Sequence, residues 1–297
     1  MEPLSRRSFL AAGAAAAATG MLPARCHAEE PAPAATPAKT GGGAAADLPL
    51  VDYHVHLDDL GIEKAVAASK AKGIRFGIVE HAGAKVHKYP VLLSSDEDLR
   101  GYLKMLAGQP VYRGIQAEGL DWMACFSKDV IAELDYVLTD ALTFREKDGR
   151  LVNLWKAEQV KVDDAQDFMD RYVDFHVEIM ATEPLDILAN GTYLPAVLGK
   201  EFDALWTGKR MGKVIDAAVK YGVALEINGT FRLPKLAFLK LAKAAGAKFS
   251  FGSNGRTTKV GEIEYSLEMA RALELTPADL FTPAPAGKKP VETRKLG

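Results

Sequence analysis

Two histidines at the start of the expected globular part have a spacing suited to metal binding. Residues 52–56 read Asp-Tyr-His-Val-His, so that His54 and His56 are two residues apart. In a β-strand, residues at this spacing project from the same face, and the two imidazoles could bind one ion together. Solvated or hydrogen-bonded histidine pairs have the same spacing, so the motif needs further ligands to define a metal site.

Polar side chains follow several short apolar runs that have the composition of strands. The expected strands cover residues 50–55, 75–80, 111–118, 135–139, 185–189, 223–227 and 248–251. The polar residues at or just after their carboxyl ends are His54, His56, Glu80, His81, Glu118, Asp140, Asn190, Glu226, Asn228, Asn254 and Arg256. Helix N-caps and turns also favour Asp and Asn at such places. Acidic, imidazole or amide groups after every strand nevertheless favour one shared site.

Helical patterns separate the expected strands, which is typical of βαβ units and a parallel sheet. The expected helices cover residues 63–72, 96–106, 128–134, 165–181, 211–220, 235–245 and 261–273. Gly73, Gly222 and Gly246 follow three of them, as at left-handed helix C-caps. We therefore expect an α/β fold, a TIM-like (β/α) barrel, in which the loops after the strands form the active face.

The size and charge of the chain limit its function classes. Its 297 residues, 48% of them hydrophobic, suffice for one barrel with a large core, so a metal would serve chemistry rather than folding. The net charge is -2 and the central sequence has no Lys/Arg run, which argues against nucleic acid and favours a small-molecule substrate. Of the two cysteines, Cys26 would be removed with a signal peptide, and Cys125 is expected in the core.

Residues 1–28 have the features of a twin-arginine (Tat) export signal. Arg6 and Arg7 precede an apolar, Ala-rich run that is too short for a durable membrane span. The partner of such a signal is the Tat export machinery, and the mature protein would be periplasmic or secreted. The Pro-Ala-Arg sequence before Cys26 is a poor lipobox, so we expect cleavage after Ala28 and no lipid anchor.

The composition also divides the rest of the chain. Residues 29–47 are rich in Pro, Ala and Gly and have almost no large apolar side chain, which predicts a disordered linker. The barrel is expected over residues 48–281, and a flexible tail over residues 282–297.

Taken in order, the strand segments resemble the motifs of the polymerase and histidinol phosphatase (PHP) family. Residues 52–56 look like its opening motif, 77–81 like its second motif and 114–118 like the strand of its metal-bridging glutamate. The resemblance continues through segments 135–138, 186–189, 224–228 and 251–254. It implies the family's distorted seven-stranded barrel and a metal-dependent hydrolase that acts on phosphoesters.

Several positions depart from the nine-ligand, three-metal site that is typical of that family. The retained ligand positions are His54, His56, His81 and Glu118, whereas Asp140 (or Leu142), Asn190, Asn254 and Arg256 replace the others. His54, His56 and Glu118 could still form a four-coordinate site with Asp140 or Asn254 and an open position for water. The resemblance thus implies one or two divalent ions, Zn, Mn or Fe, with Glu80 and Asp140 as catalytic groups.

Arg256 puts a fixed positive charge where the resemblance expects a metal ligand. Its guanidinium could occupy vacated metal space and bind a substrate phosphate or carboxylate, or it could be a surface residue of the turn at 254–256. With Asn190, Glu226 and Asn228 it forms the expected substrate-binding set.

These residues leave alternative functions open. The leading hypothesis is the metal-dependent hydrolase, and the second is a non-catalytic barrel that lost its metals and binds a small ligand. An amidohydrolase-type barrel would need histidines where the chain has Asn190 and Asn228. The charge of Asp140 distinguishes the first two, because either a metal or Arg145 would have to balance it.

Overall fold

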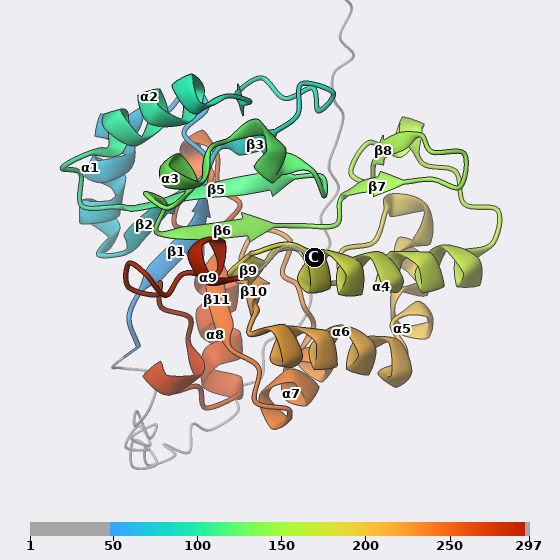
Figure 1. The fold of residues 1–297 in the computed structure, drawn as a ribbon. Coiled ribbons are helices and arrows are strands. Elements are labelled where there is room, and N and C mark those ends of the chain that lie inside the picture. Colours follow the sequence, from blue (N-terminus) through green and yellow to red (C-terminus); the bar gives the residue numbers. More distant parts are fainter. Residues whose placement is uncertain (1–47, 295–297) are drawn as a thin grey trace, which may run out of the picture. The chain divides into compact units, whose positions relative to one another are not determined.

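Seven parallel strands form the central sheet in a computed structural model that describes residues 48–294 (Figure 1). In spatial order they are β1 (Val51–Val55), β2 (Arg75–Ile78), β5 (Tyr112–Glu118), β6 (Tyr136–Thr139), β9 (Ile187–Leu188), β10 (Ala224–Asn228) and β11 (Phe249–Gly252). Each corresponds to one expected strand, and spatial order follows chain order. The predicted α/β, TIM-like barrel is confirmed.

Helices between the strands also agree with the predicted pattern. They are α1 (Ile62–Lys72), α2 (Asp96–Leu106), α3 (Lys128–Ile131), α4 (Ala165–Thr182), α6 (Gly208–Tyr221), α7 (Leu236–Ala244) and α8 (Glu264–Ala272), with short α5 (Phe202–Leu205) and α9 (Pro290–Thr293) in addition. Left-handed Gly73 and Gly222 end α1 and α6, with φ of 65° and 70°, as predicted. Figure 1 shows α4 and α6 running side by side below the sheet.

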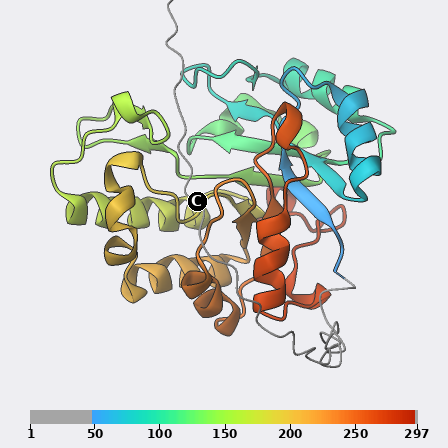
Figure 2. The same cartoon turned by 180° about the vertical axis from the view of Figure 1, so that it is seen from behind.

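The sheet closes between its first and last strands, which lie side by side (Figures 1 and 2). The backbone of Gly255 donates to the carbonyl of His54 over 3.1 Å, and His56 donates to the carbonyl of Gly255 over 3.0 Å. The buried carboxylate of Asp52 accepts from the Ser253 backbone and hydroxyl at 2.9 and 2.6 Å, and from the Gly261 backbone at 2.9 Å. Asp52 thereby joins β1 to the end of the barrel.

Tyrosines fill the barrel interior below the mouth. The ring of Tyr136 lies over Gly77 and Gly114, where an added Cβ would come within 2.4 Å of its atoms. Its hydroxyl donates to the Tyr53 carbonyl at 2.7 Å. The two glycines are therefore required by packing, and the interior is a filled core rather than a channel.

A β-bulge in β1 changes the direction of the motif histidines. Asp52 pairs with Phe76 and Val55 with Ile78, so that three steps on β1 match two on β2. As a result Tyr53 packs inside the barrel, while its neighbour His54 also reaches polar groups at the mouth.

The mouth carries short strands that the sequence pattern did not predict. The expected strand at 75–80 ends two residues early, because β2 ends at Ile78. A separate strand, β3 (His81–Gly83), follows and pairs with β4 (Leu92–Leu93) and β5. After β6, the antiparallel hairpin of β7 (Thr143–Arg145) and β8 (Leu151–Asn153) projects beside the barrel (Figure 1).

Residues 282–294, for which a flexible tail was predicted, contact the barrel through the side chains of Lys289 and Arg294. The Lys289 ammonium is buried and donates to the carbonyl of Leu134 at 2.7 Å. The Arg294 guanidinium donates to the carbonyl of Ala181 at 2.9 Å. Carbonyls at helix ends lack intrahelical partners. Lys289 and Arg294 supply donors for two such carbonyls, those of Leu134 after α3 and Ala181 in the last turn of α4.

Predictions for residues 1–47, which include the signal peptide and linker, lie outside the described residues. Within residues 48–294, no helix is long and apolar enough to cross a membrane. Cys125 is free and packs partly buried against the core, as expected.

Candidate active site at the barrel mouth

Polar residues predicted from the sequence gather at the carboxyl ends of the strands. Those that are buried are His54, His56, Glu80, His81, Glu118, Asn190, Glu226 and Asn228. Asp140, Asn254 and Arg256 are partly exposed. The hydrogen bonds among them show what each can still bind.

His54 is engaged at both ring nitrogens. Nδ1 lies 2.7 Å from Glu226 Oε1, and Nε2 lies 3.2 Å from the side-chain oxygen of Gln116. The amide nitrogen of Gln116 faces the carboxylates of Glu118 and Asp140 at 3.4 and 3.3 Å, which fixes its oxygen toward His54. His54 must then carry N–H groups on both nitrogens, which leaves no lone pair for a metal.

The charge balance at His54 agrees with this assignment. Burial lowers the pKa of His54, but the Glu226 carboxylate beside it raises the pKa further, so that the net shift is upward. Glu226 can approach so closely because residue 252 is glycine, where a Cβ would lie 2.0 Å from Glu226 Oε1.

His81 bridges a carboxylate and a guanidinium. Its Nδ1 lies 2.8 Å from Glu118 Oε1, and its Nε2 lies 3.2 Å from Arg256 Nη2. Because a guanidinium can only donate, Nε2 accepts and His81 is neutral, with its proton on Nδ1. Burial, and next the charge of Arg256, lower the pKa of His81 to about 3. Arg256 also donates to Asp58 at 2.6 Å.

His56 and Glu80 keep free polar atoms. Both ring nitrogens of His56 and Oε2 of Glu80 are buried without a hydrogen-bond partner. Nδ1 of His56 and Oε2 of Glu80 are 3.9 Å apart, while Glu80 Oε1 accepts from the Leu57 backbone at 3.0 Å. Burial lowers the pKa of His56 and raises that of Glu80 to about 7. Buried polar atoms without partners are rare in folded proteins and mark these two side chains as ligand-facing.

Asp140 is held by amides. Its carboxylate accepts from the Asn190 side chain at 3.0 Å, and Asn228 donates in turn to Asn190 at 3.1 Å and to Glu226 at 3.2 Å. Burial raises the pKa of Asp140 to about 6. The proposed balance by Arg145 is wrong, because Arg145 is exposed and its guanidinium donates to the Gly149 carbonyl.

Two asparagines of the mouth have left-handed backbones, with φ of 53° at Asn190 and 48° at Asn254. Asparagine tolerates this conformation better than most residues. For Asn254 this backbone requirement is a sufficient reason for its identity.

Several site residues were not identified from the sequence. Gln116 precedes Glu118 by two on β5, and this same-face spacing could have indicated it. Tyr89 and Thr143 carry no such pattern. The Tyr89 ring stacks on His81 with centroids 3.6 Å apart, and its hydroxyl lies 3.1 Å from Thr143 Oγ1.

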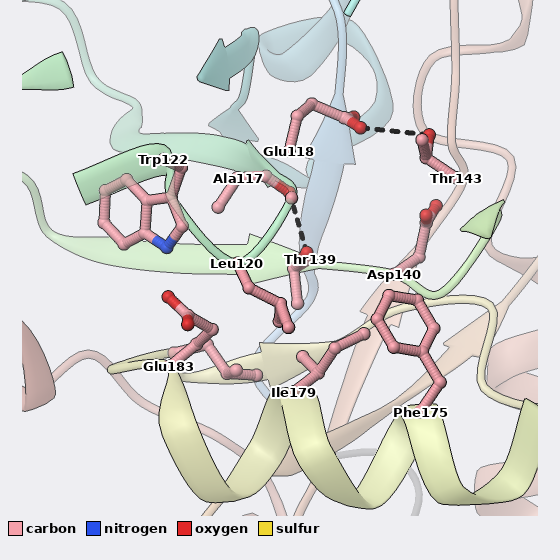
Figure 3. A pocket seen from close by; sticks show the side chains of 12 residues that line it. Ala117, Glu118, Leu120, Trp122, Thr139, Asp140, Thr143, Phe175, Ile179 and Glu183 are labelled. Atoms are coloured by element: carbon pink, nitrogen blue, oxygen red, sulfur yellow. Dashed lines mark hydrogen bonds between the residues drawn. The ribbon is translucent and has the colours of Figure 1, made fainter. Parts of the chain in front are cut away.

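Thr143, which contacts the Tyr89 hydroxyl, also lines a small cavity beside Glu118 and Asp140. It donates to Glu118 Oε2 at 3.2 Å, as Figure 3 shows. The cavity, of about 10 Å³, is lined by Glu118, Asp140 and Thr143, and by Phe175 and Ile179 of α4. This is room for about one water molecule.

The side chains do not assemble a complete metal site. Within residues 48–294, no group of three or more His, Cys, Asp or Glu side chains is arranged to hold a metal ion. His54 and His81 direct both nitrogens at protein partners, so that among these three histidines only His56 keeps ring nitrogens without a partner. Among the site residues predicted from the sequence and described by the structure, His56 and Glu80 are the two with buried polar atoms that have no hydrogen-bond partner.

Comparisons with known proteins bear on the fold. No family model and no curated protein sequence matches the chain. The histidinol phosphate phosphatase of Lactococcus lactis subsp. lactis Il1403, solved with Zn, L-histidinol and phosphate, superposes with a TM-score of 0.52 at 14% identity. The match covers 84% of this chain and 100% of that one. A Yersinia pestis DHPS with a pterine-sulfa conjugate has a TM-score of 0.36 at 12% identity, covering 76% and 95%, which supports no conclusion. The first likeness supports the PHP-like barrel and, at such identity, the fold alone.

Proposed function

We propose that this chain is an exported, metal-dependent hydrolase of the PHP type that acts on phosphoesters with a reduced metal site. The fold is that of a phosphoesterase-like barrel whose structural neighbour binds Zn. The observation that carries the proposal is the pair His56 and Glu80, with three buried polar atoms lacking a partner within the described chain.

His56 and Glu80 would hold a single divalent ion, with water or substrate completing its coordination. Such an ion would supply a Lewis acid for a phosphoryl oxygen and lower the pKa of a bound water. An ion beside Glu80 would lower the raised pKa of that carboxyl and keep it charged. The remaining chemistry belongs to side chains of the mouth.

Asp140 would transfer a proton and Arg256 would bind the charge of the substrate. Asp140, with its pKa raised to about 6, could donate a proton to a leaving oxygen near neutral pH. Arg256 is positioned by Asp58, and 40% of its side chain is exposed, so it can donate to a substrate phosphate.

A specific contact favours a second function, a metal-free barrel that binds a small ligand. Arg256 donates to the Nε2 atom that His81 would need for a metal. If protein partners occupy the metal-binding atoms throughout the mouth in this way, the carboxylates and amides bind a ligand without hydrolysing it.

Metal analysis combined with turnover separates the two functions. Protein purified without chelator should hold no more than about one equivalent of Zn, Mn or Fe and should hydrolyse p-nitrophenyl phosphate. His56→Gln should lose both, whereas His176→Gln, a buried histidine of α4, should keep them. Wild type that holds no metal and stays inactive with added Zn, Mn and Fe would reject the hydrolase in favour of the binding barrel.

Export through the Tat machinery to the periplasm or medium, without a lipid anchor, is part of the same proposal. It rests on the Arg6-Arg7 motif and the apolar run that follows. Arg6→Lys combined with Arg7→Lys should retain the protein in the cytoplasm. Mass spectrometry of exported protein with an intact Met1 would contradict cleavage.

A further inference from the structure

A cavity of about 140 Å³ lies at the end of the barrel opposite the mouth. Val51, Tyr112 and Phe249, which line it, are the first residues of β1, β5 and β11, so the cavity lies at the amino-terminal ends of the strands. Residues 280–282 of the C-terminal segment line it as well. The cavity is therefore separate from the candidate active site, which lies at the carboxyl ends.

Aromatic residues of the barrel interior line this cavity. They are Tyr53, Tyr112 and Phe281. The ring of Tyr53 stacks on that of Tyr112 with centroids 5.5 Å apart, and it meets the ring of Phe281 edge-on at 5.1 Å. Aromatic rings attract a further ring in the same two geometries. Among the described residues that line the cavity, none is Asp, Glu, His, Lys or Arg, so the lining favours a neutral ligand with an aromatic ring.

Ser250 gives the cavity a polar group that lacks a partner. The residue is 2% exposed, and its hydroxyl has no hydrogen-bond partner within residues 48–294. Its neighbours Phe249 and Phe251 pack in the large core that includes residues of the helices. Because side chains alternate along a strand, Ser250 points to the barrel interior. A buried hydroxyl without a partner costs free energy, which a ligand with its own hydroxyl would recover.

The size of the cavity limits its occupant to one small ring. An apolar cavity of about 150 Å³ is large enough to bind benzene. A buried water usually needs two to four polar partners. Within the described chain, Ser250 is the single lining residue with a buried side-chain atom that lacks a partner. Pro49 and Thr282 are exposed at the edge of the cavity, so a ligand can enter from solvent.

We propose that this cavity binds a small neutral phenol, whose hydroxyl bonds to Ser250. The ring of the phenol would lie among Tyr53, Tyr112 and Phe281. Binding needs no metal, because every contact comes from the chain, and it is independent of the proposed hydrolase. The bound ring would also contact the C-terminal segment, where the Phe281 backbone donates to the Phe249 carbonyl at 2.7 Å. A ligand that binds the folded chain in this way raises its melting temperature.

Calorimetry with phenol and benzene in EDTA tests the cavity and its hydroxyl separately. Wild type should bind both, and phenol about fivefold more tightly, which is the scale of one hydrogen bond. Ser250→Ala should still bind benzene and should lose the preference for phenol. Ser266→Ala is the matched control, because it removes a buried hydroxyl of α8 that donates to the Ile227 carbonyl at 2.6 Å. This control should keep the preference for phenol.

Phenylalanine variants test the location of the ligand. Phe281→Ala removes one wall of the cavity and should weaken phenol and benzene alike. Phe231→Ala, which changes a partly exposed residue outside the cavity, should bind both as wild type does. Equal weakening by the two variants would overturn the proposal.

Other outcomes would also overturn it. One is a preference for phenol that survives in Ser250→Ala. Another is neither heat nor a rise in melting temperature with either compound, which would mean that the cavity holds water only. None of these measurements depends on turnover, so they leave the proposed hydrolase to its own test.

Discussion

Arg256 Nη2 lies 3.2 Å from Nε2 of His81, so that a guanidinium faces the lone pair a metal ion would need. The opposite nitrogen of His81 is bound to Glu118 at 2.8 Å. The contact explains why His81, which the sequence predicted as a metal ligand, is not free to bind a metal. It also limits the number of ions that the mouth can hold.

Arg256→Ala should therefore create a zinc site. The substitution frees Nε2 of His81 together with the carboxylate of Asp58, which are both held by the guanidinium. Calorimetry should show zinc binding strengthened at least about tenfold, or 1.4 kcal/mol. Arg232→Ala, which removes an exposed arginine paired with Glu268, serves as the control. Equal zinc affinity of Arg256→Ala and wild type would show that the guanidinium does not exclude the metal.

His176 should make the protein sensitive to acid. Burial lowers its pKa from 6.5 to about 4, so the unfolded chain binds a proton that the folded chain excludes. Its stabilising contribution is present above pH 6.5 and is lost as the pH falls toward 4. His176→Phe should lessen the loss of unfolding free energy between pH 7 and pH 4 by up to about 3 kcal/mol. Urea unfolding at both pH values measures it, and parallel curves for variant and wild type would contradict the assignment.

Asp186 should act in the opposite direction. Burial raises its pKa from 3.8 to about 7, so the folded state holds a proton that the unfolded chain releases. The unfolding free energy therefore falls as the pH rises from about 4 through 7. Asp186→Asn should stabilise the protein at pH 8 and have little effect at pH 4, because an amide oxygen can still accept from the Val137 backbone. A pH-independent difference in unfolding free energy would exclude the titration of Asp186 as its cause.

Lys289 should be a stabilising anchor. Lys289→Met leaves the partly buried carbonyl of Ala132 and the buried carbonyl of Leu134 without their donor, which should cost about 1–3 kcal/mol of unfolding free energy. Lys288→Met changes the exposed neighbour and should cost little. Similar melting temperatures for the two variants would mean that the C-terminal segment does not contribute.

Alternation of strand and helix patterns was enough to predict the barrel. Each expected strand is present, and α2 has the predicted bounds of Asp96 and Leu106. The spacing of hydrophobic residues along each segment indicates which face of that helix or strand is buried. Because consecutive parallel strands usually lie next to each other, few strand orders are possible for the sheet. The predicted gathering of polar side chains at one end follows from the same geometry.

Contacts between side chains were not predictable in the same way. The bulge in β1 is a register shift that a period-two pattern does not contain. The contact of Arg256 with His81 joins residues 175 apart in sequence, and either residue alone also fits a metal or a surface role. Tyr89 and Thr143 come from a loop and a hairpin whose positions depend on packing rather than on local pattern.

The hydrogen bonds of the Asp52 carboxylate to Ser253 and Gly261 can form only when the last strand of the barrel is in place. Its partners Ser253 and Gly261 lie 201 and 209 residues later, so the seam between β1 and β11 stays open until almost the whole chain has been synthesised. Until then the first strand presents an unpaired edge, which is prone to pairing with other chains. Closing so long a loop is slow relative to local helix formation. The rate of synthesis and the concentration of other chains in the cell should therefore affect the yield of folded protein more than its free energy of unfolding.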